Sequence, residues 1–174
     1  ANSTPPLAFE PNQGQADESV QFLTRVPGQT VWFTSDEFIL RVHGESETST
    51  LRYRFAGGSP DPALEPEHPL RGKYHYLNGS RPDRWIKDVP IWGKLHRSEV
   101  YEGIDVDFYG RAGSLEFDFI VTAGADPSLI RIAVDGSGAP RIDAGGDLVF
   151  PTAAGDVRQH RPIAFQRAQG KRRD

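Results

Sequence analysis

Residues 101–132 read YEGIDVDFYGRAGSLEFDFIVTAGADPSLIRI, and two short segments of this stretch alternate between apolar and polar residues. In residues 104–109 the apolar side chains fall on even positions, and in residues 115–119 they fall on odd positions. A repeat of two is typical of a strand with one buried face, because successive side chains point to opposite sides. The four residues between the segments include two glycines and leave room only for a tight turn. The stretch therefore predicts a β-hairpin.

The register of this hairpin follows from its two apolar faces. They coincide only if directly opposed residues have numbers with an odd sum, because a slip of one residue would turn one apolar set toward water. The simplest such register places Gly110 opposite Gly113. It also opposes like charges on the outer face, Asp107 to Glu116 and Asp105 to Asp118. Each such pair costs up to about 1 kcal/mol, so a compensating partner is expected.

A neighbouring basic strand is the first kind of partner that could compensate these carboxylates. Residues 51–55 alternate in the same way and place Arg52 and Arg54 on their polar side. Lys94 and Arg97 are further candidates. An exposed ladder of charges is common on the polar face of a sheet, which favours this interpretation.

Two chemical interpretations of the same carboxylates stay open. A hard cation such as Ca²⁺ would bind to carboxylate oxygens, although the spacing here matches no calcium-binding loop. Its candidate ligands are Asp105, Asp107, Glu116 and Asp118. Alternatively, two carboxyl groups about 5 to 10 Å apart could hydrolyse a glycoside. Because no histidine or aromatic platform is tied to them, we assign no catalytic residue, expect no enzyme activity and expect no cofactor other than Ca²⁺.

Composition limits the remaining classes. The chain has 174 residues, of which 37% are hydrophobic, and a formal net charge of −4 with both signs interspersed. This length suits one domain with a substantial core, and this charge argues against nucleic acid as a partner. No apolar run approaches the roughly 20 residues of a membrane span. The chain contains no cysteine and begins without an apolar leader, so we expect no disulfide and expect any secretion signal to have been removed.

Glycine and proline separate many short segments that have the alternation of strands. Thirteen segments fit: 20–25, 30–34, 37–43, 50–56, 73–77, 91–97, 104–109, 114–121, 130–134, 141–143, 147–150, 157–160 and 163–167. Helix is limited to single turns at 98–101 and at 126–129, where Asp126 can cap. The pattern predicts an all-β, sandwich-like fold of short antiparallel strands, with two small sheets in tandem as an alternative.

The predicted domain organisation is simple. We expect an extended tail at residues 1–8 and one all-β domain at residues 9–174, with a subdivision near residues 85–100 as an alternative. Residues 57–72 contain four prolines and are predicted to form one long loop, because proline is excluded from central strands.

A group of aromatic residues flanks the polar segment 78–84. Exposed aromatic rings beside hydrogen-bonding groups are what a sugar-binding platform requires, although aromatic residues near strands more often belong to the core. The candidate glycan-binding residues are Tyr74, Tyr76, Trp85 and Trp92. The five histidines show no metal-binding spacing.

Several ordered motifs support a family resemblance: FEPNQGQ at 9–15, VQF at 20–22, YEGID at 101–105, LEFDF at 115–119, GADP at 124–127 and RPIAFQ at 161–166. Together they resemble an uncharacterised β domain near the mature N-terminus of large secreted bacterial proteins. In that family the domain precedes SBBP (β-propeller-like) repeats or accompanies adhesin modules. The resemblance spans residues 9–173 and implies an exported protein, extracellular or on the cell surface. It brings no activity, cofactor or catalytic residue.

The functional hypothesis depends on the two ends of the chain. A turn signal follows residues 163–167, and only Arg172, Arg173 and Asp174 remain for a returning strand beyond Lys171. We expect this partner strand to be missing, which leaves an edge that can pair with another chain. The tail at residues 1–6 could dock on a neighbour in a head-to-tail assembly, the alternative being a boundary produced by cloning or proteolysis.

The sequence thus predicts a structural or adhesive module without enzyme activity. It would associate with itself, as a filament or surface array completed by strand exchange, or with other β modules. A carbohydrate-binding module and a carboxylate-dependent glycosidase are the alternatives. No nucleic acid partner and no membrane span are expected.

Overall fold

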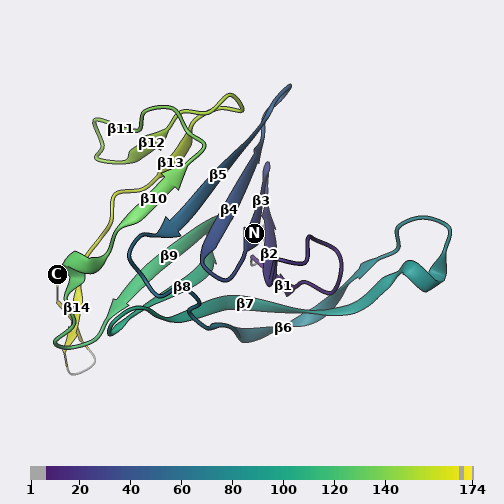
Figure 1. Ribbon diagram of the computed structural model, residues 1–174, viewed down its shortest axis with the longest axis horizontal. Coiled ribbons are helices and arrows are strands. Elements are labelled where there is room, and N and C mark those ends of the chain that lie inside the picture. Colours follow the sequence, from purple (N-terminus) through teal and green to yellow (C-terminus); the bar gives the residue numbers. More distant parts are fainter. Residues whose placement is uncertain (1–6, 169–170, 174) are drawn as a thin grey trace.

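The computed structural model describes residues 7–168 and 171–173 of the chain. Within them the chain forms fifteen strands and two single-turn 3-10 helices (Figure 1). The elements are β1 (Phe9–Pro11), β2 (Phe22–Val26), β3 (Gln29–Phe33), β4 (Glu37–His43), β5 (Thr48–Phe55), β6 (Leu64–Tyr76), η1 (Pro82–Arg84), β7 (Ile86–Tyr101), β8 (Ile104–Arg111), β9 (Ser114–Val121), η2 (Pro127–Leu129), β10 (Ile132–Asp135), β11 (Arg141–Ile142), β12 (Leu148–Phe150), β13 (Val157–Gln159), β14 (Gln166–Ala168) and β15 (Lys171–Arg173).

One antiparallel sheet of ten strands makes up most of the domain. Its order is β10-β5-β4-β3-β2-β1-β7-β8-β9, and β6 pairs with β7 outside this path. The long strand β7 connects the two halves of the sheet, since Phe9 of β1 pairs with Trp92 and β8 pairs along its later residues. A small sheet of β11, β12 and β13 covers one end, and β14 pairs with β15.

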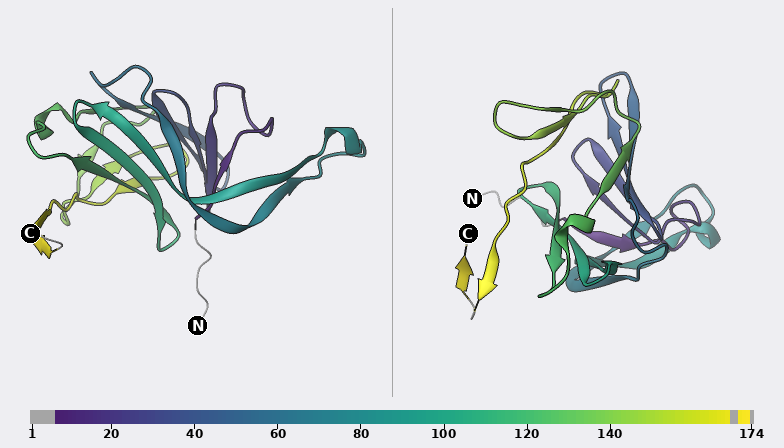
Figure 2. Two further views of the ribbon diagram at one scale, coloured as in Figure 1. Left: turned by 90° about the horizontal axis from the view of Figure 1, so that it is seen from below. Right: turned by 60° about the vertical axis from the view of Figure 1, so that its left-hand side comes forward.

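The main sheet curls so that distant strands face each other across the core (Figure 2). Phe38 on β4 contacts Phe108 on β8 and Phe117 on β9, with 5.4 and 5.6 Å between ring centroids. Phe55 on β5 meets Phe119 on β9 at 5.7 Å. These strands are far apart in the sheet order, so the curl lets the inner face bury its aromatic rings against itself. The all-β, sandwich-like prediction is confirmed.

The predicted hairpin is present, but its register is shifted. The odd-sum rule holds, with Phe108 opposite Phe117, whereas the pairing of Gly110 with Gly113 is wrong. The two turn residues are Ala112 and Gly113, which have φ values of 51° and 83°. A two-residue hairpin turn of this kind needs positive φ at both positions, and glycine tolerates it best. The turn is therefore made by Ala112 and Gly113, one residue later than the predicted register requires.

The predicted long loop at 57–72 is correct only for residues 57–63, because β6 begins at Leu64 and includes Pro66 and Pro69. The strand pairs only with β7 among the described residues, so the missing N–H groups of its prolines can face its unpaired edge. Proline is excluded from central strands but is tolerated in an edge strand such as β6. The predicted helical turn at 98–101 is wrong, because these residues belong to the strand β7. The subdivision near residues 85–100 stays a prediction.

The two ends of the chain differ from expectation as well. The returning strand at the C-terminus is present as β15, whose residues Lys171–Arg173 pair with β14. The expectation of a missing partner strand is therefore wrong. At the N-terminus, β1 begins at Phe9 and was not predicted, while the predicted tail at 1–6 lies outside the described residues. The turn at η2 is confirmed, with the Asp126 side chain accepting from the Ser128 N–H.

Candidate functional site

The outer face of the β7–β8 pair holds the carboxylates that drew attention in the sequence. Lys94 Nζ lies 2.6 Å from Asp107 and 2.9 Å from Glu67. Nδ1 of His96 lies 2.7 Å from Asp107, and its Nε2 lies 3.5 Å from Asp105. Lys94 and His96 alternate along β7 and so share one face. They place positive charge and hydrogen-bond capacity beside the carboxylates of β8.

The compensating partners are therefore only partly those predicted. Lys94 has the predicted role, whereas Arg52 and Arg54 pair elsewhere, with Glu37 at 3.1 Å and Asp135 at 2.6 Å. Arg97 lies an odd number of residues from Lys94 and so points to the opposite face, into the core. His96 was missed, although its spacing of two from Lys94 would have placed it correctly.

The four predicted metal ligands do not converge. Asp107 lies opposite Asp118, but Asp105 lies opposite Ile120 and Glu116 opposite Tyr109, so the predicted oppositions of Asp105 and Glu116 are wrong. The hydroxyl of Tyr109 donates to Asp118 at 3.0 Å. Burial and this hydrogen bond raise the pKa of Tyr109 to about 12. Over residues 7–168 and 171–173, no group of three or more histidine or acidic side chains is arranged to hold a metal ion.

The four predicted glycan-binding aromatic residues have different environments. Trp92 packs against the core. The indole N–H of Trp85 donates to the Gly79 carbonyl, and the Lys87 ammonium lies 5.0 Å from the ring centroid. Tyr74 is 40% exposed, and Tyr76 is half-buried. Glycan binding thus stays a prediction, and Tyr74 is the most open ring of the four.

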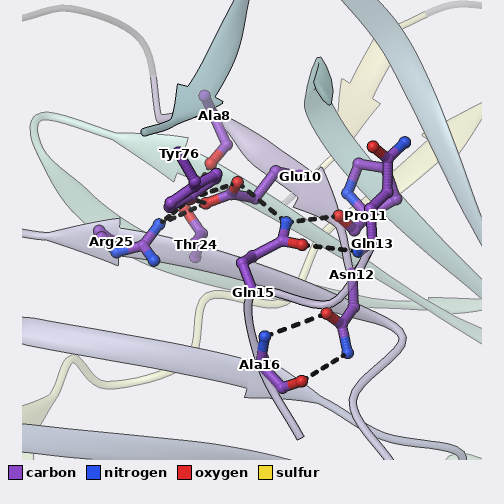
Figure 3. A network of polar contacts seen from close by, with 10 residues as sticks. All are labelled: Ala8, Glu10, Pro11, Asn12, Gln13, Gln15, Ala16, Thr24, Arg25 and Tyr76. Atoms are coloured by element: carbon purple, nitrogen blue, oxygen red, sulfur yellow. Dashed lines mark hydrogen bonds and ion pairs between the residues drawn. The ribbon is translucent and has the colours of Figure 1, made fainter. Parts of the chain in front are cut away.

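A polar cluster that was not predicted surrounds Glu10, whose side chain is buried against the outer face of β1 and β2 (Figure 3). Its carboxylate accepts from the Tyr76 hydroxyl, which lies 2.5 Å from each oxygen. The Arg25 guanidinium donates to the same carboxylate, and the Gln15 amide donates at 3.2 Å. We call these four residues the Glu10 cluster. It joins β1, the loop between β1 and β2, β2 itself and the end of β6.

The loop after β1 is held by its own side chains, which explains the FEPNQGQ motif. The Asn12 amide donates to the carbonyls of Asp17 and Val20 at 2.7 and 2.9 Å. The Gln15 amide also donates to the Pro11 carbonyl at 2.8 Å. The amide side chains thus replace a regular turn and position Gln15 beside Glu10 (Figure 3).

The Glu10 cluster shifts the pKa values of Tyr76 and Arg25. Burial, followed by the hydrogen bond to Glu10, raises the pKa of Tyr76 to about 12, and Arg25 acts in the opposite direction. Burial lowers the pKa of Arg25, but the hydrogen bond to Tyr76 and the charge of Glu10 outweigh it, so the net shift is upward. The cluster therefore keeps a neutral tyrosine and a charged arginine around one buried carboxylate.

Two adjoining hollows of about 410 and 340 Å³ lie at the turn between β7 and β8. Residues of the YEGID and GADP motifs line them, and Glu102 and Leu129 border both. Their acidic lining residues are Glu99, Glu102 and Asp126, and neither hollow is lined by lysine, arginine or histidine. We call this region the acidic end. The four carboxylates considered for metal binding or glycoside hydrolysis, Asp105, Asp107, Glu116 and Asp118, line neither hollow.

Comparison with known proteins identifies the family. Residues 9–174 of this chain match the family model described as "Domain of unknown function (DUF7948)". The chain belongs to the DUF7948 family. No curated protein and no solved structure matches it. The extent of the DUF7948 match agrees with β1 beginning at Phe9. Both helices in the described part of the chain are single turns, and neither has the length to cross a membrane.

Proposed function

We propose that this DUF7948 domain is a structural or adhesive module of an exported protein, without enzyme activity, that docks on other folded modules. The observation that carries the proposal is the two-stranded ribbon formed by β6 and β7, which projects from the body and ends in η1 (Figures 1 and 2). We call residues 71–90 of this ribbon the arm. An isolated two-stranded ribbon is marginally stable in water, so a projecting one needs an anchor on the body or a partner along its length.

The Glu10 cluster anchors the arm at the pair of Tyr76 and Ile86, where the ribbon leads into its terminal loop. Tyr76, the last residue of β6, reaches across to β1 and β2, where Glu10 accepts its hydrogen bond. The Arg25 guanidinium also lies 5.5 Å from the Tyr76 ring centroid. Gly14 packs close to Ile86, the first residue of β7. The arm is thus attached at a defined place, which a rigid docking element requires.

The surface of the arm suits a protein partner. Leu77 is 54% exposed and Tyr74 is 40% exposed, while Trp85 is half-buried. Arg71 and Arg84 are exposed on the same segment. Tyrosine, tryptophan and arginine are enriched among the residues that contribute most to protein interfaces. This composition supports docking by the arm in place of the strand exchange expected from the C-terminus.

Crosslinking of the natural protein tests this proposal. The arm offers two exposed amines, Lys73 and Lys87, to an amine-reactive crosslinker. We expect both to form crosslinks to other chains or other modules when the intact protein is treated in its native location, outside the cytoplasm. Crosslinks from these lysines that stay within the domain, or recovery of the protein from the cytoplasm, would contradict the proposal. Lys94, which is engaged by Asp107 and Glu67, serves as the internal control.

Carbohydrate binding is a second candidate, favoured only by the open ring of Tyr74 beside the cations of the arm. A glycan array probed with the wild-type domain and with Tyr74→Ala tests it. Binding that the substitution abolishes would support it. Equal signals from both proteins, or none from either, would remove it.

A further inference from the structure

We propose that the arm of one copy docks on the acidic end of a second copy, so that the chains associate head to tail. This inference rests on the proposed docking function and names its partner. It follows from two surfaces of opposite charge that the structure places at opposite ends of the same strand, β7. The first lies before Pro90, and the second surrounds Tyr101.

The arm carries a surplus of positive charge that its own carboxylates do not neutralise. Residues 71–90 contain five lysines and arginines and two aspartates, a net charge of +3 in a chain of net charge −4. Asp88 pairs with Lys73 at 3.3 Å and Asp83 with Arg81 at 2.7 Å. The other cations, Arg71, Arg84 and Lys87, form no ion pair with the described residues. Three cations without an ion pair to the described residues therefore lie together on the arm.

The acidic end carries the complementary surplus. Glu99, Glu102 and Asp126 form no ion pair with a basic side chain in the described part of the chain, and the Asp126 carboxylate accepts from the Ser128 N–H. Glu99 has a φ of 54°, and this irregular backbone accompanies the register shift between Arg97 and Tyr101. The exposed side chain of Leu129 borders both hollows. The hollows thus combine an apolar side chain with a carboxylate rim.

The apolar side chain and the carboxylates of the acidic end are complementary to the side chains at the tip of the arm. Leu77 and Trp85 offer apolar surface, and Lys87 and Arg84 flank Trp85 in sequence. An apolar centre surrounded by opposite charges is the usual composition of a specific interface, and charge complementarity fixes its orientation. Another copy of the same chain displays this surface.

The geometry favours a contact between copies over one within a copy. β7 has 16 residues, so its ends are about 50 Å apart at roughly 3.3 Å per residue. The arm therefore cannot fold back onto the acidic end of its own chain while β7 is intact. Two different surfaces that meet in this way form a heterologous interface, which adds further copies in an open chain or closes into a ring.

Charge reversal at each surface tests the proposal by sedimentation velocity of the purified chain. The arm variant is Arg84→Glu with Lys87→Glu, and the acidic-end variant is Glu99→Lys with Glu102→Lys. We expect the wild type to associate at about 0.01 M salt and to dissociate at about 1 M, where charges are screened beyond roughly 3 Å. Each variant alone should be monomeric, because its two surfaces now repel, with association weakened by at least about tenfold.

Mixing the two variants provides the decisive measurement. The acidic-end variant keeps an intact arm and the arm variant keeps an intact acidic end, so the mixture should associate although neither component does. A matched control is Glu45→Lys with Glu47→Lys, which makes the same change in net charge on the exposed turn between β4 and β5. It should associate at least as well as the wild type. Circular dichroism confirms that each variant remains folded.

The contrary results are equally specific. A wild type that stays monomeric at low salt, or a mixture of variants that does not associate, overturns the head-to-tail proposal. Binding of the arm to an acidic polysaccharide by a monomeric wild type would overturn it in favour of a glycan partner. If the arm lysines of the natural protein nevertheless crosslink to different modules, the docking function stands and only the identity of the partner is wrong.

Discussion

Glu10 and Arg97 are both fully buried charged residues, on the paired strands β1 and β7, and the fold treats them differently. The carboxylate of Glu10 accepts from three side chains, including one cation. The guanidinium of Arg97 donates to the Thr34 carbonyl at 2.5 Å, while its Nε and its second terminal nitrogen have no partner among the described residues. One buried charge is satisfied, and the other is largely unsatisfied.

The difference shows what burial of a charge can achieve. The partners of Glu10 come from the loop after β1, from β2 and from β6, so its burial joins segments far apart in the sequence. Burial lowers the pKa of Arg97 to about 10, and the charges of Asp36 and Asp61 oppose this shift without contacting the group. A buried charge without full pairing costs stability. Glu10 therefore organises the fold, whereas Arg97 is a cost that the fold tolerates.

The largest effect should follow the loss of the cation beside Glu10. Arg25→Met leaves a buried carboxylate without its counter-charge, and we expect the free energy of unfolding to fall by about 3 kcal/mol. Urea denaturation of the purified domain measures it. A loss below about 1 kcal/mol would show that Tyr76 and Gln15 alone satisfy Glu10. The difference drawn between Glu10 and Arg97 would then be refuted.

Replacement of the other buried cation should have the opposite sign. Arg97→Met keeps a long side chain, removes the unpaired N–H groups and removes the buried charge. We expect the free energy of unfolding to remain unchanged or to rise by up to about 2 kcal/mol. The same urea titration applies. A clear destabilisation would mean that Asp36 or Asp61 pairs with Arg97 in solution and that the two sites are alike.

Tyr76→Phe should cost about 1 kcal/mol at neutral pH, because one hydrogen bond to the buried carboxylate is lost. The pH dependence sharpens this prediction. The folded-state pKa of Tyr76 is about 12, above its ordinary value of 10.0, so its contribution is complete below pH 10 and is lost as the pH rises toward 12. Tyr53 and Tyr109 share this behaviour.

The alkaline loss of stability should consequently be shallower in Tyr76→Phe than in the wild type. Urea titrations at several pH values between about 9 and 12 measure the slope. An identical slope in both proteins would show that the Tyr76 hydroxyl is not held by Glu10.

The smallest effect is expected at an exposed ion pair of similar geometry. Arg54 is as exposed as Arg25, but its partner Asp135 is 59% exposed, whereas Glu10 is 1% exposed. Arg54→Met should therefore change the free energy of unfolding by less than about 1 kcal/mol. Because the substitution matches Arg25→Met, the difference between the two isolates the burial of the partner. Equal losses would refute that explanation.

The sequence predicted what depends on local pattern. The alternation in residues 104–109 and 115–119 gave both strands, and Asp126 with Pro127 gave the turn at η2. It did not predict the position of the hairpin turn, because any odd sum satisfies the alternation and only backbone φ selects one. The strand at 73–77 was predicted, but the first part of β6, residues 64–72, was missed, since proline excludes a central strand but allows an edge strand.

The candidate sites were less predictable than the strands. Four carboxylates on two strands suggested a metal or catalytic site, but the shift in register places Asp107, and not Asp105, opposite Asp118. The Glu10 cluster depends on Tyr76, which is 66 residues away, and no local pattern reports such a contact. Arg97 and Lys94 were treated alike, although an odd spacing along a strand places them on opposite faces.

The sequence by itself determined the all-β class, the facing of most strands and the surplus of basic residues in the arm, because alternation and composition are local properties. Only the tertiary structure decided which charges are buried and which surfaces remain open. Those outcomes depend on how the sheet curls and where β6 and β7 leave it, and both follow from packing between strands that are distant in the sequence.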